Sequence, residues 1–419
     1  MTARGLLPFR TPTRHALRAA TAGAAVLALS VAGCQSTKDS AQQPTNGGGP
    51  GTSESPSSAP STPVVPKAQI AVNVENGADD VTVDTALKVT AAQGKLSTVK
   101  VESPKGKPLA GSMNANGTAW TAASLLEPGR SYRVDATAKN SAGVTTRQTT
   151  RFHSEDLTLD EQTYPSIAPL RGETVGVGMP AIVQFDVPVT NRASIERHLS
   201  VTSTAHVAGS WHWVSDQEVH WRPKHFWPSG TRVTVKADIN SIPAGNGIYG
   251  QMNRSTSFVV GDSVIDKINI ATDEMNVYIN GSLARTIPVT GGMPGWDTRS
   301  GTKLIVEKFL SRRMDAATVG ISPSSPDYYN IPDVQYAMRV TYSGEFLHAA
   351  PWSEYAQGSY NVSHGCVGMS TENAAWLFNL SHRGDVVQVT GTSRGLEDGN
   401  GWTDWNMSFK EYKQGSALS

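Results

Sequence analysis

A cysteine and a histidine in the last quarter of the chain could together perform nucleophilic chemistry. Cys366 follows Gly365 and comes 18 residues after His348. A thiol attacks well only as a thiolate, and a neighbouring imidazole can take its proton and then stabilise the negative charge. The glycine opens backbone conformations that let N–H groups approach a reacting carbonyl. The pair predicts acyl transfer through a thioester, and the alternative is a buried cysteine beside a core histidine.

The flanking segments predict how these two side chains are held. Residues 339–349 alternate as two short strands joined at Ser343-Gly344, which puts His348 near the end of a strand. Residues 371–378 begin a helix with an acidic residue in its first turn, which puts Cys366 on the loop before that helix. Loops held by a rigid scaffold commonly carry reactive side chains.

The residues around the pair form a longer pattern: His348-x-x-Pro351-Trp352, followed by Ser363-His364-Gly365-Cys366. This pattern resembles the active-site signature of the L,D-transpeptidases, whose catalytic domain is called YkuD. The resemblance covers roughly residues 263–410, and the order of the flanking domains is similar to that of the actinobacterial, lipid-anchored members. Two positions depart from the family. Gly368 stands where Asn is usual, and Thr298-Arg299-Ser300-Gly301 matches the usual Thr-Pro-x-Gly only in part.

The resemblance implies a peptidoglycan L,D-transpeptidase, a cysteine acyltransferase that forms 3→3 cross-links. Cys366 would attack the amide between the third and fourth residues of a tetrapeptide stem and release D-Ala. His348 would move the proton, and the carbonyl of Ala349 would orient its ring. An amine of a neighbouring stem would then resolve the thioester. The family also implies acylation by carbapenems, and no metal or cofactor is expected.

The resemblance also implies which residues contact the substrate. The oxyanion is expected to bind the N–H groups of Gly365 and Cys366 together with a tyrosine of a lid, either Tyr329 or Tyr328. Three further residues of the pattern are expected to touch the substrate: Ser363, His364 and Trp352.

Other functions fit the same residues. Water could resolve the thioester, which would make an L,D-carboxypeptidase, or a protein amine could, which would make a protein-anchoring enzyme. A general cysteine peptidase would cleave ordinary L,L peptides. A non-enzymatic wall-binding lipoprotein would use its other domains, with the last domain inert.

Composition favours a multidomain β protein. The chain has 419 residues, and its 36 basic and 36 acidic residues cancel, so nothing indicates nucleic-acid binding. Charged residues make up only 17%, while 39 Gly and 24 Pro suit turn-rich strands. We expect two immunoglobulin-like β-sandwiches followed by a β-rich YkuD domain with one main helix after the cysteine.

The first 34 residues read as a lipoprotein signal peptide. Four arginines precede an apolar run at 19–33, which is short for a membrane span. The run ends in Leu29-Ser30-Val31-Ala32-Gly33-Cys34, which resembles a lipobox. A lipid on Cys34 would anchor the exported protein to the outer face of the cytoplasmic membrane, and the polar segment 35–66 would be a disordered linker toward the wall. The alternatives are an ordinary secretory signal or a Cys34–Cys366 disulfide.

Residues 67–154 and 155–261 read as a repeated pair of sandwiches. Trp120 and Trp221 lie 101 residues apart, and after each tryptophan the next glycine and two apolar positions recur at the same spacing. The second repeat holds five histidines and four tryptophans, namely His198, His206, His212, His220, His225, Trp211, Trp213, Trp221 and Trp227. We expect the tryptophans to pack in the core and at domain interfaces rather than to bind a sugar. We expect the histidines to occupy polar positions or the edges of sheets rather than to bind a metal.

Residues 262–395 are expected to form the catalytic domain. Strands are predicted at 264–271, 275–279, 282–289, 303–309 and 385–390, with Asn280-Gly281 as a hairpin turn and a helix at 373–382. The segment 311–334 contains three prolines and reads as a structureless lid. The tail 396–419, with Trp402, Trp405 and Phe409, is expected to dock on the catalytic domain.

Overall fold

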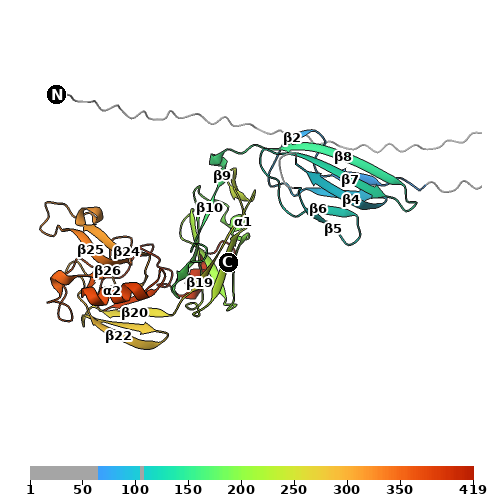
Figure 1. The fold of residues 1–419 in the computed structure, drawn as a ribbon. Coiled ribbons are helices and arrows are strands. Elements are labelled where there is room, and N and C mark those ends of the chain that lie inside the picture. Colours follow the sequence, from blue (N-terminus) through green and yellow to red (C-terminus); the bar gives the residue numbers. More distant parts are fainter. Residues whose placement is uncertain (1–64, 104–107) are drawn as a thin grey trace, which may run out of the picture. The chain divides into compact units, whose positions relative to one another are not determined.

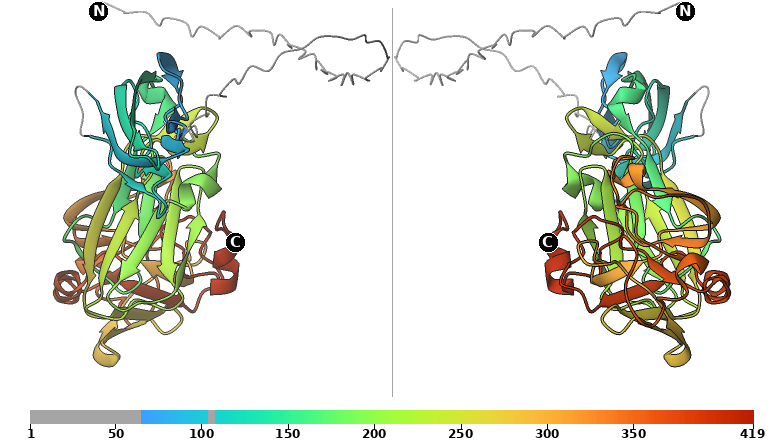
Figure 2. Two further views of the ribbon diagram at one scale, coloured as in Figure 1. Left: turned by 90° about the vertical axis from the view of Figure 1, so that its right-hand side faces the viewer. Right: turned by 90° about the vertical axis from the view of Figure 1, so that its left-hand side faces the viewer.

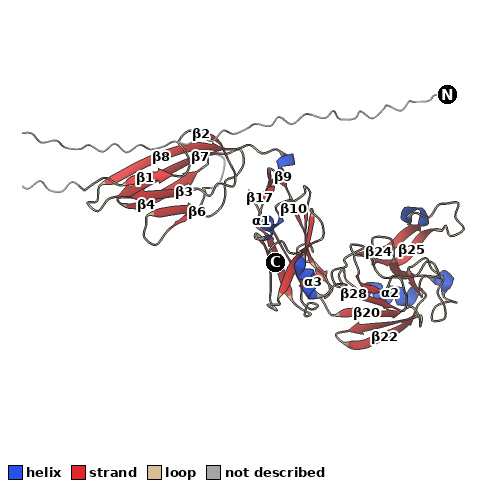
Figure 3. Cartoon of the chain, turned by 180° about the vertical axis from the view of Figure 1, so that it is seen from behind, coloured by secondary structure: helices blue, strands red, loops and turns tan. Residues whose placement is uncertain are grey.

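The structure is a computed structural model, and it describes residues 65–103 and 108–419. The predicted signal peptide, Cys34 and nearly all of the predicted linker lie outside the described residues. Strands dominate the described chain, as the sequence predicted (Figure 3). None of the helices in these two ranges combines the length and the apolar character that crossing a membrane would need.

The first set of strands builds two four-stranded sheets around one apolar core. One sheet has the order β1 (Gln69–Val72), β3 (Lys88–Ala92), β6 (Ala119–Ala122), β5 (Gly111–Met113). The other has the order β2 (Ala78–Val81), β8 (Thr145–Ser154), β7 (Ser131–Lys139), β4 (Lys95–Glu102). Trp120, Tyr132 and Val134 are buried between them, because alternate side chains of a strand point to the same face.

The second set repeats this topology strand for strand. Its first sheet has the order β10 (Pro165–Ala168), β12 (Ala181–Phe185), β15 (Glu218–Pro223), β14 (Gly209–Trp213). Its second sheet has the order β11 (Thr174–Val175), β19 (Arg254–Val260), β16 (Arg232–Ala237), β13 (Leu199–Ser203). A small third sheet joins β17 (Pro243–Gly245), β18 (Ile248–Gly250) and β9 (Gln162–Thr163), and short helices η1 (Leu159–Glu161) and α1 (Arg192–Glu196) complete the set.

The equivalence of the two sets confirms the predicted repeat. Trp120 on β6 and Trp221 on β15 occupy matching strands, and both are buried. In each set the second sheet also begins with a parallel pair, β2 with β8 and β11 with β19. The four tryptophans of the second set are all buried, and Trp221 stacks on Trp227 at 5.3 Å between ring centroids, so they are packing residues as predicted.

His220 is held by two carboxylates. Its Nδ1 lies 2.9 Å from Asp404 and its Nε2 lies 2.8 Å from Glu218. Burial disfavours the charged ring, but these two carboxylates outweigh it and raise the pKa of His220 to about 9. The hydrogen bonds of His220 thus join the second set to the C-terminal tail.

The third set of strands forms the two sheets that carry the candidate site (Figure 1). The five-stranded sheet has the order β22 (Ser282–Pro288), β21 (Glu274–Ile279), β20 (Val264–Asn269), β28 (Val386–Thr390), β23 (Gly301–Leu304). The four-stranded sheet has the order β24 (Glu307–Asp315), β25 (Asn330–Arg339), β26 (Phe346–Ala349), β27 (Val367–Met369). Helix α2 (Thr371–Leu380) packs against β25 and β26, and short helices η2 (Ala316–Val319) and η3 (Pro351–Ser353) lie in the loops.

The predicted hairpin and the strands beside it are confirmed. Asn280 and Gly281 have φ values of 50° and 84° between β21 and β22, as a turn with two left-handed residues requires. The strand predicted at 303–309 is wrong in one respect. It is interrupted at Ile305 and Val306, so β23 joins one sheet and β24 joins the other.

The prediction of a structureless lid at 311–334 was wrong at both ends of the segment. Strands β24 and β25 extend into its two ends, up to residue 315 and from residue 330, while residues 316–329 between them hold only the short helix η2 and irregular chain. The ladder passes from Val334 to Ile331 through a register shift, and Pro332 lies within that shift. A proline lacks the N–H that a regular ladder uses, so an irregularity accommodates it without ending the strand.

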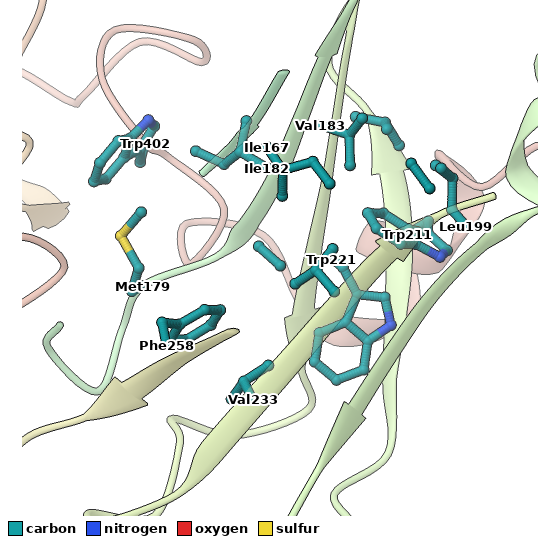
Figure 4. Close-up of a cluster of buried hydrophobic side chains, with 14 of the residues drawn as sticks. Ile167, Met179, Ile182, Val183, Leu199, Trp211, Trp221, Val233, Phe258 and Trp402 are labelled. Atoms are coloured by element: carbon teal, nitrogen blue, oxygen red, sulfur yellow. The ribbon is translucent and has the colours of Figure 1, made fainter. Parts of the chain in front are cut away.

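The C-terminal tail contacts more than the catalytic domain. Asn406 donates to the carbonyl of Thr302 in β23, which agrees with the predicted docking. However, Trp402 belongs to an apolar cluster built mainly by the second set (Figure 4), which also includes Leu304 and Val386 of the third set. The indole N–H of Trp405 donates to the carbonyl of Gly178 at 2.7 Å. Helix α3 (Phe409–Gln414) lies against β14, near the C-terminus marked in Figure 2. The aromatic residues of the tail therefore also dock on the second sandwich, which the prediction missed.

Candidate active site

Two neighbouring strands bring the predicted nucleophile and base together. β26 and β27 run parallel, with His348 opposite Gly368 and Leu347 opposite Val367. Cys366 directly precedes β27, so its side chain leaves the same face of the sheet as His348. With strands about 4.8 Å apart and a rise of about 3.3 Å per residue, their Cα atoms are diagonal neighbours at about 8 Å. The sequence separation of 18 residues is thus closed by a parallel crossover.

Both side chains open into one cavity of about 230 Å³. Of the residues predicted for the site, Cys366, His348, Trp352, Ser363, His364 and Tyr329 line it, whereas Tyr328, Ala349 and Gly365 do not. The other lining residues are Thr290, Met314, Ile331, Ala350, Ser353, Tyr355, Val362 and Gly368. The motif residues that were predicted to meet the substrate are therefore brought to one site.

The ring of His348 is oriented for proton transfer. Its Nδ1 lies 2.7 Å from the carbonyl oxygen of Ala349, which can only accept a hydrogen bond. Nδ1 therefore carries the proton, and Nε2 is the free basic atom. Burial lowers the pKa of His348, although this hydrogen bond opposes the effect. The hydrogen bond to Ala349 that the resemblance implied is present.

The thiol of Cys366 is held as a neutral group. Sγ donates to the carbonyl of Gly344 across 3.6 Å, in the turn between β25 and β26. Burial raises the pKa of Cys366 to about 12, and the nearby Glu345 carboxylate adds to this effect, while Lys303 and Arg339 oppose it. The sulfur is therefore protonated in this conformation, and a base has to remove its proton before it can attack.

The loop before the cysteine is closed by its own serine. Ser363 Oγ donates to the carbonyl of Cys366 at 2.6 Å and accepts from the N–H of Gly365 at 3.0 Å. Gly365 has φ 117°, a left-handed conformation that a side chain would strain. The N–H of Gly365, which was expected at the oxyanion, is thus already paired with Ser363 in this structure.

The structure separates the two lid tyrosines. Tyr328 hydroxyl donates to Asp315 at 3.1 Å and does not line the cavity. Tyr329 lines the cavity, and within residues 65–103 and 108–419 its hydroxyl has no hydrogen-bond partner. Burial raises the pKa of Tyr329 to about 12, so the hydroxyl keeps its proton. Of the two, Tyr329 is the one placed to donate to a bound group.

His364 packs between two aromatic rings. Its ring centroid lies 5.1 Å from that of Trp296 and 4.9 Å from that of Tyr329. Its Nε2 is buried and, among the described residues, has no hydrogen-bond partner. Burial lowers the pKa of His364. The residue therefore helps to hold the lid tyrosine and also offers one unpaired ring nitrogen beside the cavity.

Gly368 has a packing reason to lack a side chain. A Cβ added there would lie 2.8 Å from the Cβ of Ala350 and 3.3 Å from the Cγ2 of Thr290. The Asn that is usual in the family would collide at the strand that faces His348 unless Ala350 moved. In this chain the lack of a side chain at Gly368 lets Ala350 and Thr290 lie close to β27.

A buried ion cluster lies beneath the nucleophile, and sequence reasoning missed it. Lys303 and Glu345 form a buried salt bridge. The same carboxylate accepts from Arg299 Nη1 at 3.0 Å and from the Arg299 backbone N–H at 3.1 Å. A proline at 299, as in the family motif, has no N–H to donate. Arg299, which replaces the proline of the family motif, therefore has a structural role. Its side chain and its backbone N–H both hold Glu345, the residue that follows Gly344.

Replacing Glu345 by alanine should destabilise the catalytic domain by about 3–5 kcal/mol, because Lys303 would keep a buried charge with no carboxylate. Chemical denaturation followed by the exposure of the Cys366 thiol measures this change. The double variant Glu345→Gln with Lys303→Met should recover most of the loss. The exposed pair Lys100–Glu102 is the control, and Glu102→Ala should cost about 0–1 kcal/mol. Equal effects at the two sites would contradict the role given to the cluster.

Comparison with known proteins places these features in a family. A family model for the L,D-transpeptidase catalytic domain matches residues 265–389, and a model for a bacterial Ig domain matches residues 78–243. L,D-transpeptidase 2 of Mycobacterium tuberculosis is 36% identical over 355 residues, which cover 84% of this chain and 86% of that protein. L,D-transpeptidase 5 of the same species is 30% identical, covering 84% and 78%.

Solved structures of similar proteins cover about half of this chain. One is an L,D-transpeptidase in complex with imipenem, which is 36% identical and covers 54% of this chain and 97% of that chain, with a TM-score of 0.48. Another is L,D-transpeptidase 3 from Mycobacterium tuberculosis with a faropenem-derived adduct, at 33% identity, 54% and 97% coverage and a TM-score of 0.45.

Proposed function

The chain belongs to the L,D-transpeptidase family, and we propose that it forms 3→3 cross-links between peptidoglycan stems through a thioester on Cys366. One observation carries the proposal: His348 on β26 and Cys366 just before the neighbouring β27 open into one cavity, and the basic Nε2 of His348 has no hydrogen-bond partner among the described residues. Such a pair meets the need of a thiol for a base.

The first half of the reaction acylates the enzyme. The Cys366 side chain turns away from the Gly344 carbonyl, and His348 Nε2 takes the thiol proton. Sγ then bonds to the carbonyl carbon between the third and fourth stem residues. As the C–N bond breaks, the protonated imidazole gives its proton to the leaving amine of D-Ala. The products of this half are a thioester and a neutral His348.

The second half transfers the acyl group to an acceptor. An amine of a neighbouring stem attacks the thioester carbon, the C–S bond breaks, and the amine proton passes through His348 to the departing sulfur. The oxyanion of each tetrahedral intermediate is held by the N–H of Cys366 and the hydroxyl of Tyr329, which is protonated at neutral pH. Carbapenems, whose strained ring also offers a carbonyl to a thiolate, are proposed to acylate the same sulfur.

Product analysis with a purified tetrapeptide stem tests the function. We expect a cross-linked dimer and one free D-Ala per cross-link. A tripeptide with D-Ala and no dimer would indicate an L,D-carboxypeptidase, and transfer to an added protein amine would indicate an anchoring enzyme. Cleavage of ordinary L,L peptides without any reaction of the stem would contradict the proposal.

The proposed base predicts the pH dependence of the reaction. Because burial lowers the pKa of His348 below its ordinary 6.5, the imidazole stays neutral further into the acid range. A protonated ring cannot accept the thiol proton. We therefore expect kcat/KM to be level near neutral pH and to fall on acidification, with a midpoint below pH 6.5. A midpoint between about pH 8 and 9, as for the ionisation of a free thiol, would contradict the role of His348.

A further inference from the structure

The mouth of the cavity carries an unusual group of exposed rings. Four aromatic side chains in the described ranges are exposed among the large apolar residues, and three of them lie within nine residues: Trp352 (48% exposed), Tyr355 (70%) and Tyr360 (49%). The fourth, Tyr342, lies in the turn between β25 and β26. We call Trp352, Tyr355 and Tyr360 the mouth rings. We propose that the mouth rings bind the glycan portion of the donor, a neutral saccharide attached to the stem peptide.

The loop that carries the rings is fixed, although the rings themselves are exposed. Ala356 in its centre is fully buried, and the N–H of Gly358 donates to the carbonyl of Val289 at 2.9 Å. The N–H of Tyr360 donates to the carbonyl of Ala356 at 3.0 Å. The rings therefore do not serve to pack the loop down. A cluster of exposed aromatic side chains on a fixed loop beside a site marks a place where a ligand binds.

The mouth rings are continuous with the catalytic pair. Trp352 and Tyr355 line the same cavity as Cys366, and the ring centroid of Trp352 lies 5.8 Å from that of His348. Tyr355 and Tyr360 lie 6.1 Å apart, with their ring planes inclined by 53°. The mouth rings thus begin at the base, where Trp352 stacks on His348, and Tyr355 continues them to the exposed Tyr360.

The chemistry of the loop fits a neutral saccharide. Residues 351–362 contain no lysine or arginine, and Glu354 is their only charged residue. A loop of this kind has no attraction for anionic lipid or for an acidic peptide. Aromatic faces carry negative charge density and attract the positively polarised C–H groups of a sugar ring, while the exposed hydroxyl of Ser359 can bond to one of its hydroxyl groups.

The length of the stem places a sugar at the rings. This step rests on the proposed function, in which the amide after the third stem residue reaches Cys366. Three residues then connect that amide to the lactyl group of the amino sugar, a distance of at most about 10–11 Å when they are extended. A stem bound in the cavity therefore brings its sugar to the rim, where Tyr355 and Tyr360 lie, and not to a distant surface.

A matched pair of donors tests the proposal on the full chain. One donor is the free tetrapeptide, and the other is the same tetrapeptide joined to its disaccharide. For the wild type we expect kcat/KM to be about tenfold higher with the disaccharide donor, mainly through a lower KM. In the double variant Tyr355→Ala with Tyr360→Ala, this ratio should fall to about one. The Phe–Phe double variant keeps the rings and should keep the ratio, as should Leu283→Ala, an equally exposed apolar residue on β22.

Each contrary result has its own meaning. A ratio near one in the wild type, with both donors turned over, would overturn the saccharide site and leave the transpeptidase proposal intact. An equal loss with both donors in the Ala–Ala variant would show that the rings contact the peptide, and would also overturn it. Failure of the wild type to react with either donor would instead contradict the proposed function.

Discussion

Replacing Cys366 by alanine is expected to lower the rate of cross-link formation by at least about 10⁴-fold, to a level set by binding alone. The thiol supplies the bond through which the acyl group is held, and the cavity offers no second nucleophile of comparable strength. Ser363 is the nearest hydroxyl by sequence, but its Oγ is paired with the carbonyl of Cys366 and the N–H of Gly365. Cross-linked product from a purified stem measures the effect.

The control for this variant is a measurement of its stability, which shows whether it is still folded. The Cys366 side chain is small and packs with Met314 and Phe346, so the alanine variant should unfold at nearly the same denaturant concentration as the wild type. A folded Cys366→Ala variant that still forms dimer at more than a hundredth of the wild-type rate would rule out the thioester. If the protein were instead a non-enzymatic wall-binding protein, this substitution should leave its binding to the wall unchanged.

Replacing His348 by glutamine should lower kcat by about 10²–10⁴-fold, the usual contribution of a positioned acid–base group. Glutamine can keep a hydrogen bond to the Ala349 carbonyl but cannot take the thiol proton, whose removal is unfavourable because burial raises the pKa of Cys366 to about 12. The remaining activity should rise with pH, because hydroxide then replaces the missing base. Initial rates of D-Ala release at several pH values measure both effects.

His364 provides a matched control within the same cavity. It lies two residues from the nucleophile, but its ring packs between Trp296 and Tyr329, and its Nε2 has no hydrogen-bond partner in the part of the chain that the structure describes. His364→Gln should therefore lower kcat by about tenfold or less, through the position of the lid tyrosine. If His364→Gln lowered kcat more than His348→Gln did, the base would be His364, and the role given to His348 would be wrong.

The parts of the fold that were predictable have local signals. Asn280-Gly281 marks its hairpin because both residues tolerate positive φ, and the repeated tryptophan spacing marks two equivalent sandwiches. The central pair of the site was also predictable, because His348 and Cys366 belong to one compact motif whose strands pair directly. In each case the signal is a short motif, or the spacing between two such motifs, that can be recognised along the sequence.

The parts that were missed depend on contacts between distant residues. Arg299, Lys303 and Glu345 are ordinary charged residues in the sequence, and only the folded sheets bring them together under the nucleophile. The lid was read as structureless because prolines are rare in strands, whereas a register shift accommodates Pro332. The tail was assigned to one domain because its aromatic residues do not indicate which core receives them.

Intact-protein mass after incubation with a carbapenem tests most directly whether Cys366 is a nucleophile activated by His348. We expect a single adduct on the wild type, no adduct on Cys366→Ala, and an adduct that forms at least about a hundredfold more slowly on His348→Gln. An adduct that persists on Cys366→Ala, or one that forms equally fast without the imidazole, would contradict the account.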